Sequence, residues 1–128
     1  MTQTIFLNIS NHPSVNWSEA QTYAALQFAG RVLDLPFPEV PPEVDTPLVY
    51  EIARQTVDSI PDNVTHAMVM GEFTLVYALV GLLREKGIIP LTATTIRLVE
   101  EFQDGSKLSR FEFVRFREYP SQPWPDST

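Results

Sequence analysis

The chain is 128 residues long, and its 9 Lys and Arg against 16 Asp and Glu give it a formal net charge of -7. This length predicts one domain, and the absence of cysteine excludes disulfide frameworks, cysteine-based zinc sites and thiol nucleophiles. An acidic chain also argues against binding to long nucleic acids, which depends on several Lys or Arg contacts to phosphates. No apolar run reaches the roughly 18 residues that span a bilayer, and the first residues do not resemble a signal peptide. We therefore expect a cytoplasmic protein.

The first third of the chain predicts a strand, a helix and a second strand. Residues 4–9 are a short apolar run rich in β-branched side chains, which is typical of a buried strand, and residues 31–35 predict a second strand. Between them, Ser18 and Gln21 have the spacing of a capping box, and apolar residues continue at helical spacing to Gly30.

Two further helices and two further strands are predicted in the middle of the chain. Thr46 is followed by a proline, which predicts a helix N-cap at Thr46, and this helix ends before Pro61. Residues 65–70 and 88–92 predict the third and fourth strands. A third helix between them, over residues 71–87, is apolar on most sides, so the rest of the fold or a second subunit must cover it.

The order β-α-β-α-β-α-β favours an α/β fold with a parallel sheet covered by helices on both faces. Right-handed crossovers then make 2-1-3-4 the expected strand order. Two strand-like runs, 96–102 and 107–119, flank Asp104-Gly105, a dipeptide typical of hairpin turns. We therefore predict one domain over residues 1–119, with an antiparallel hairpin at a sheet edge, and a proline-rich tail at 120–128.

Ligands of open parallel sheets bind beyond the carboxyl ends of the strands, where successive crossovers go to opposite faces. With a 2-1-3-4 order, this point lies between the first and third strands. The loops 10–14, 71–74 and 92–97 are predicted to converge there. Their polar and charged side chains form the candidate site, which comprises Ser10, Asn11, His12, Gly71, Glu72, Thr74, Thr94, Thr95 and Arg97.

Each of these candidates also has a purely structural interpretation. His12 suits a general base or a donor to a phosphate, but it is also compatible with simple packing in a loop. Gly71 either lets a phosphate approach the helix N-terminus or permits a tight turn capped by Thr74. Glu72 either complements the helix dipole or binds ribose hydroxyls and base amines. Arg97 either meets a phosphate or is solvated.

Other polar residues favour structural roles. No metal site is expected, because the acidic residues Asp34, Glu39 and Glu43 lack ligand spacing, and no cofactor is expected either. His66 is expected to be structural, because it lies near the start of a buried strand. Basic and aromatic residues alternate in the hairpin, which can indicate RNA binding, but neighbouring glutamates favour a packed sheet face or a dimer surface. The basic residues are Arg110, Arg115 and Arg117.

Several segments together resemble a known family. They are the first strand running into Asn-Ile-Ser-Asn-His-Pro, the proline loop Leu-Pro-Phe-Pro, Met-Gly-Glu-Phe-Thr, and Phe-Val-Arg-Phe-Arg-Glu-Tyr. This set resembles small CRISPR-associated Rossmann-like proteins, which are similar to the CARF-type sensors and ring nucleases of type III CRISPR systems. The resemblance extends from the first strand to Tyr119.

The resemblance implies a homodimeric, Rossmann-like protein of antiviral defence that binds cyclic oligoadenylate and cleaves it without a metal. In such enzymes a ribose 2′-hydroxyl attacks the neighbouring phosphate and leaves a 2′,3′-cyclic phosphate. In this chain, Asn11 and His12 would orient or deprotonate the hydroxyl, and Arg97 would stabilise the developing charge. Gly71 and Thr74 would hold a phosphate or a base.

Two alternatives stay open at the level of sequence. One is a non-catalytic sensor or accessory protein-interaction module that uses the same loops. The other is a nucleoside-processing enzyme with Glu72 as nucleophile or base.

Overall fold

The computed structural model describes residues 3–121, and the predicted tail lies outside the described residues from residue 122 onward. Within residues 3–121, no helix is long and apolar enough to cross a membrane. The elements are β1 (Ile5–Ser10), η1 (Ser14–Asn16), α1 (Glu19–Phe28), β2 (Arg31–Pro36), α2 (Thr46–Asp58), β3 (Val64–Val69), α3 (Phe73–Glu85), β4 (Ile89–Glu101) and β5 (Lys107–Glu118).

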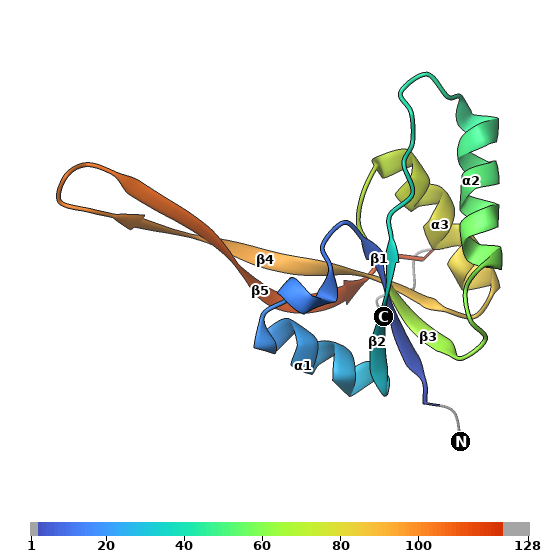
Figure 1. Cartoon of the computed structure of the whole chain (residues 1–128), viewed down its shortest axis with the longest axis horizontal. Helices are drawn as coiled ribbons and strands as arrows, with labels where there is room; N and C mark the ends of the chain where they lie inside the picture. Colours follow the sequence, from blue (N-terminus) through green and yellow to red (C-terminus); the bar gives the residue numbers. More distant parts are fainter. Residues whose placement is uncertain (1–2, 122–128) are drawn as a thin grey trace, which may run out of the picture.

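The strands form one mixed sheet in the order β2-β1-β3-β4-β5 (Figure 1). Strands β1 to β4 are parallel, and β5 runs antiparallel to β4 at the sheet edge. Helix α1 covers one face of the sheet, and α2 and α3 cover the other (Figure 1). The α/β class, the 2-1-3-4 order and the C-terminal antiparallel pair are therefore confirmed.

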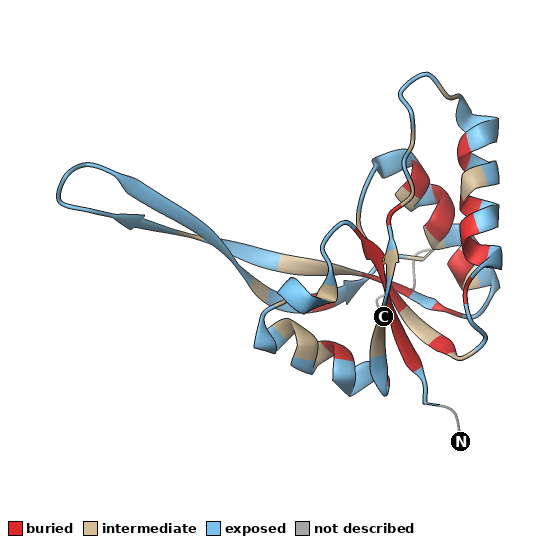
Figure 2. Ribbon diagram, in the orientation of Figure 1, coloured by how far each residue is buried: buried red, intermediate tan, exposed pale blue. Residues whose placement is uncertain are grey.

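Strand β1 lies between β2 and β3 and is buried on both faces, which explains its continuous apolar run (Figure 2). Ile5, Leu7 and Ile9 pack into the core beneath α2 and α3. Phe6 belongs to the smaller core on the α1 side, where it packs with Met68 of β3. The alternation of side chains along β1 thus supplies both cores.

The expected break between a fourth strand at 88–92 and a separate hairpin strand at 96–102 is wrong. Strand β4 runs without interruption and pairs with β5 along its length, with a bulge between Thr94 and Thr95. The segment from Leu91 to Glu101 is rich in β-branched residues and contains no glycine or proline that would end a strand. Residues 94–117 therefore form a two-stranded ribbon, here called the arm, which projects from the body and is largely exposed (Figures 1 and 2).

The helix starts show which cap predictions hold. The hydroxyl of Ser18 accepts a hydrogen bond from the N–H of Gln21 at 3.2 Å, so the predicted N-cap of α1 is confirmed. The predicted Thr46 cap of α2 is wrong, because the N-cap is Asp45, whose carboxylate accepts from the Thr46 N–H at 2.8 Å. Aspartate is the better cap here, since it brings a negative charge to the positive end of the helix dipole.

Candidate functional site

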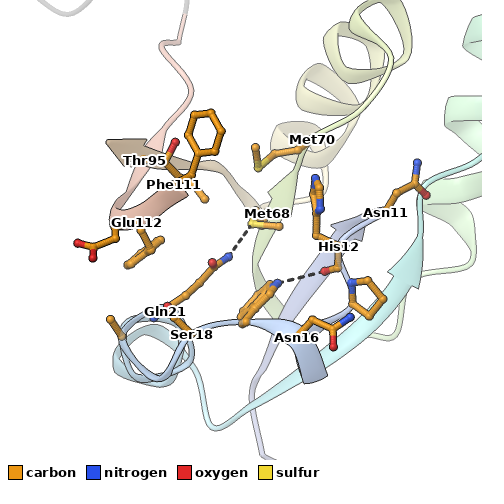
Figure 3. A pocket seen from close by; sticks show the side chains of 15 residues that line it. Asn11, His12, Asn16, Ser18, Gln21, Met68, Met70, Thr95, Phe111 and Glu112 are labelled. Carbon is orange, nitrogen blue, oxygen red and sulfur yellow. Dashed lines mark hydrogen bonds between the residues drawn. The ribbon is translucent and has the colours of Figure 1, made fainter. Parts of the chain in front are cut away.

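A pocket of about 730 Å³ opens at the carboxyl edge of the sheet, between the start of α1 and the base of the arm (Figure 3). Its walls come from the loop after β1, from η1 and α1, from the end of β3, and from β4 and β5. The pocket therefore lies beside the point between β1 and β3 at which the crossovers diverge, on the α1 side of the sheet.

Aromatic side chains stand on opposite sides of the pocket. Trp17 lies between η1 and α1 and packs edge-on against Phe6, with ring centroids 6.2 Å apart. Phe111 and Phe113 come from β5, and Phe111 is 69% exposed although it is a large apolar side chain. A flat aromatic ligand could stack on these rings.

Amide side chains supply hydrogen-bonding groups to the lining of the pocket. Asn11, Asn16 and Gln21 line the pocket, and Met68 and Met70 of the β3 end form its floor (Figure 3). Each amide offers both donors and an acceptor, so the set can match the mixed edge of a heterocyclic base.

Asn8 holds the loop after β1 in place from beneath. This side chain is buried, and its Nδ2 donates to the carbonyl of His12 at 2.8 Å and to Asp34 Oδ1 at 3.0 Å. Its Oδ1 accepts from the Ser10 hydroxyl at 2.6 Å. Sequence analysis missed Asn8, although a single amide inside an otherwise apolar strand was a usable signal.

The carbonyl of His12 is shared by two elements of the site. Besides Asn8, the indole N–H of Trp17 donates to it at 3.1 Å (Figure 3). The Asp34 carboxylate accepts from the Ser14 N–H at 3.2 Å, which fixes the other side of the same loop. One hydrogen-bond network therefore holds the backbone of this loop and the Trp17 indole relative to each other, and the exposed His12 imidazole projects from the same loop.

Only part of the predicted site meets at this pocket. Asn11, His12 and Thr95 line it, and Ser10 lies buried directly beneath the loop. Five further predicted residues do not line the pocket. They are Gly71, Glu72, Thr74, Thr94 and Arg97.

Gly71 lies against the ring of Phe37. A β-carbon added at Gly71 would be 2.6 Å from the Cδ1, Cδ2 and Cε1 atoms of that ring. The ring belongs to the proline-rich loop after β2, whose apolar residues Phe37, Val40 and Val44 pack on the α2–α3 core. The small size of residue 71 is therefore required by close packing of the protein itself.

Glu72 is the N-cap of α3. Its Oε1 accepts from the Leu75 N–H at 2.8 Å and from the Thr74 hydroxyl at 2.5 Å. The Thr74 hydroxyl above all, and then the Leu75 N–H, hold the pKa of the Glu72 carboxyl below its usual value. A carboxylate thus occupies the helix end at which a phosphate would otherwise bind.

Thr94 and Arg97 belong to the arm, because β4 continues where a loop was expected. The Thr94 hydroxyl donates to the Arg115 carbonyl at 3.0 Å and accepts from the Arg115 N–H at 3.2 Å, which bridges the bulge. Arg97 is exposed, and its Nε donates to the Ser109 hydroxyl at 2.6 Å. Since side chains alternate along a strand, Arg97 shares the face of Thr95, one step beyond the pocket.

His66 lies away from this pocket, at the start of β3. Its ring stacks with Phe6 and packs against Phe28, and its Nδ1 is 2.8 Å from the Thr65 hydroxyl. Burial lowers the pKa of His66, against an opposing effect of the Glu118 carboxylate. Among residues 3–121, no three His, Asp or Glu side chains come together in a way that could hold a metal ion.

Residues 4–117 match the family described as Uncharacterized protein MJ1673 family. The chain belongs to this family. The match to the MJ1673 family includes the loop after β1, the β3 end and the β4–β5 pair, so every wall of the pocket lies in the segment that matches. No curated protein and no solved structure shows a significant match to the chain.

Proposed function

We propose that this protein is a Rossmann-like nucleotide-binding protein whose ligand is cyclic oligoadenylate, bound in the pocket between α1 and the arm. The observation that carries the proposal is the combination of aromatic walls and amide side chains at the carboxyl edge of a 2-1-3-4 sheet. The sequence resemblance to CRISPR-associated CARF-type proteins supports the choice of ligand and a role in type III antiviral signalling.

Recognition of the bases would rest on stacking and on amide hydrogen bonds. Trp17 and Phe111 offer ring faces to unstacked bases, and such stacking contributes about 1–3 kcal/mol per base. Asn and Gln side chains can pair with the N6 and N7 atoms of adenine, since one amide provides both the acceptor and the donor. Asn11, Asn16 and Gln21 would take this role, because they line the pocket.

The phosphates would contribute less than the bases. Among the described residues that line the pocket there is no lysine or arginine, and the one acidic residue is Glu112, whose place in the strand alternation directs its side chain to the opposite face of the arm. Arg97, on the same face as Thr95 and just beyond it, is the group available to a phosphate at the rim. Binding should therefore depend only weakly on ionic strength.

The position of His12 in the lining of the pocket supports a further step, which is cleavage of the bound ligand. With His12 as general base, the ribose 2′-oxygen gives up its proton and forms a bond to the neighbouring phosphorus. The bond between phosphorus and the 5′-oxygen breaks, and the 5′-oxygen takes up a proton. The products are linear and end in a 2′,3′-cyclic phosphate, without oxidation or reduction. Arg97 would stabilise the charge that develops on the phosphate oxygens.

Incubation of the purified protein with cyclic tri-, tetra- and hexa-adenylate, followed by separation of the products and by calorimetric titration, tests this function. Phe111→Ala should weaken binding about tenfold through lost stacking. Val99→Ala, on the same arm but outside the pocket, should leave affinity unchanged. His12→Ala should retain binding and lose cleavage.

Two results would decide against parts of the proposal. Binding without linear products from the wild-type protein would identify a non-catalytic sensor. The lack of lysine and arginine among the described lining residues favours this alternative. No binding of any of the three rings would reject the ligand class altogether.

A further inference from the structure

The arm leaves apolar side chains uncovered that a lone ribbon cannot bury. Ile96, Val99, Leu108, Phe111 and Val114 are each between 49% and 69% exposed. An isolated two-stranded ribbon is at best marginally stable in water, whereas packing against a further layer stabilises it. A patch of this kind on an extended element is typical of a protein–protein contact.

The two faces of the arm differ. The face that carries Thr95 and Phe111 turns toward the pocket and α1. The opposite face, here called the back face, carries Ile96, Leu98 and Leu108 at its centre, because these residues alternate with those of the pocket face. Nothing within residues 3–121 covers this centre, since Ile96 and Leu108 are about half exposed.

Charges on the back face are separated along its length. Near the body, Arg110, Arg115 and Arg117 stand against the single acid Glu112, which leaves this stem positive. At the far end, Glu100 and the turn residue Asp104 make the tip negative. The Arg110–Glu112 contact at 3.5 Å lies within the stem and does not change this imbalance.

We propose that two copies of this chain pair through the back faces of their arms, antiparallel about a two-fold axis between Ile96 and Leu98, which brings Glu100 of each copy to the level of Arg115 of the other. This arrangement places the negative tip of each arm on the positive stem of the other, with Ile96, Leu98 and Leu108 of both copies between them. A two-fold interface must be self-complementary, and a ribbon with opposite charges at its two ends meets that condition. Each chain carries a net charge of -7, so the bodies of the two copies repel each other and stay apart. Both pockets remain open in this dimer, because they lie on the opposite faces of the arms, so pairing does not depend on the proposed ligand.

Charge reversal tests the geometry, with sedimentation velocity of the ligand-free protein as the readout. In the tip variant, Glu100→Lys with Asp104→Asn makes the tip positive, so tip and stem repel. In the stem variant, Arg115→Glu with Arg117→Glu makes the stem negative where it faces the tip of the other arm, with the same result. All four side chains are exposed, and circular dichroism confirms that each variant folds. Each variant alone should dimerise at least about tenfold more weakly, because contacts reverse at both ends of the interface.

Mixing the two variants supplies the decisive measurement. The positive tip of one then faces the negative stem of the other, and the wild-type stem faces the wild-type tip, so a heterodimer should form. Arg31→Glu with Arg54→Glu changes the net charge as much as the stem variant but lies off the arm, and this control should remain dimeric. A monomeric wild-type protein, a mixture that stays monomeric, or a control that dissociates equally would overturn the proposal.

Discussion

At position 71, the ring of Phe37 lies where a β-carbon would be, with three ring carbons 2.6 Å from that site. Gly71→Ala should therefore lower the free energy of unfolding by about 1–3 kcal/mol, since the buried ring must move out of a packed core. Urea denaturation measures this change. Ligand affinity should not fall, because the pocket lies elsewhere.

A double-mutant cycle separates this packing from any other role of Gly71. In a Phe37→Leu background, the substitution of Gly71 by alanine should cost much less, since the flat ring is gone. An equal cost in both backgrounds would show that another contact requires the glycine. A loss of ligand affinity in Gly71→Ala would restore its interpretation as part of a phosphate cradle.

His66 links stability to pH. Burial lowers its pKa in the folded protein below the ordinary value of 6.5, so the unfolded chain binds more protons between the two values. Stability contributed by neutral His66 is full above pH 6.5 and falls as the pH decreases toward the folded pKa. Melting temperatures measured across this window should rise with pH.

The matched variant is His66→Gln, which keeps a polar group beside Thr65 but does not titrate. Its melting temperature should vary less with pH in the same window than that of the wild-type protein. Equal slopes in the two proteins would assign the pH dependence to carboxylates instead, and the inferred role of His66 would be wrong.

At the level of elements, the sequence predicts the β-α-β units because local signals and burial agree. The strand β1 is apolar throughout and lies between two covered faces, and Ser18 caps α1 as its spacing predicts. The β4–β5 hairpin was predicted as well, but the continuity of β4 was not, because its outer part is exposed and carries alternating charges, so no burial pattern marks the continuation through Thr94 and Thr95.

The candidate site was predicted only in part for a similar reason. Strand ends locate Asn11 and His12, because every strand of a parallel sheet ends at the same edge. Sequence alone does not tell on which side of that edge the pocket opens. It opens on the α1 side, away from Gly71 and the start of α3, and its aromatic wall Phe111 comes from the arm, whose path was not foreseen.

At the scale of the whole molecule, the two faces of the sheet differ in what packs on them. The α1 side holds the pocket, whereas the α2–α3 side holds the larger core and anchors the segment after β5. The Tyr119 hydroxyl donates to the Val69 carbonyl at 2.6 Å, and the Arg84 guanidinium donates to the Tyr119 and Pro120 carbonyls. Stability and ligand binding should therefore be separable at this segment.

Chains that end at Ser121 and at Glu118 test this separation, because they differ only by the anchored segment. The chain ending at Glu118 should be less stable by on the order of 2–3 kcal/mol, since it loses a half-buried aromatic ring and its hydrogen bond. Tyr119→Phe in the chain ending at Ser121 should cost about 1 kcal/mol, the share of the hydroxyl. Urea denaturation gives these values, and calorimetry with cyclic tetra-adenylate should give equal affinities for all three chains at a temperature at which each is folded. Affinity that falls in step with stability would show that the two faces of the sheet are coupled.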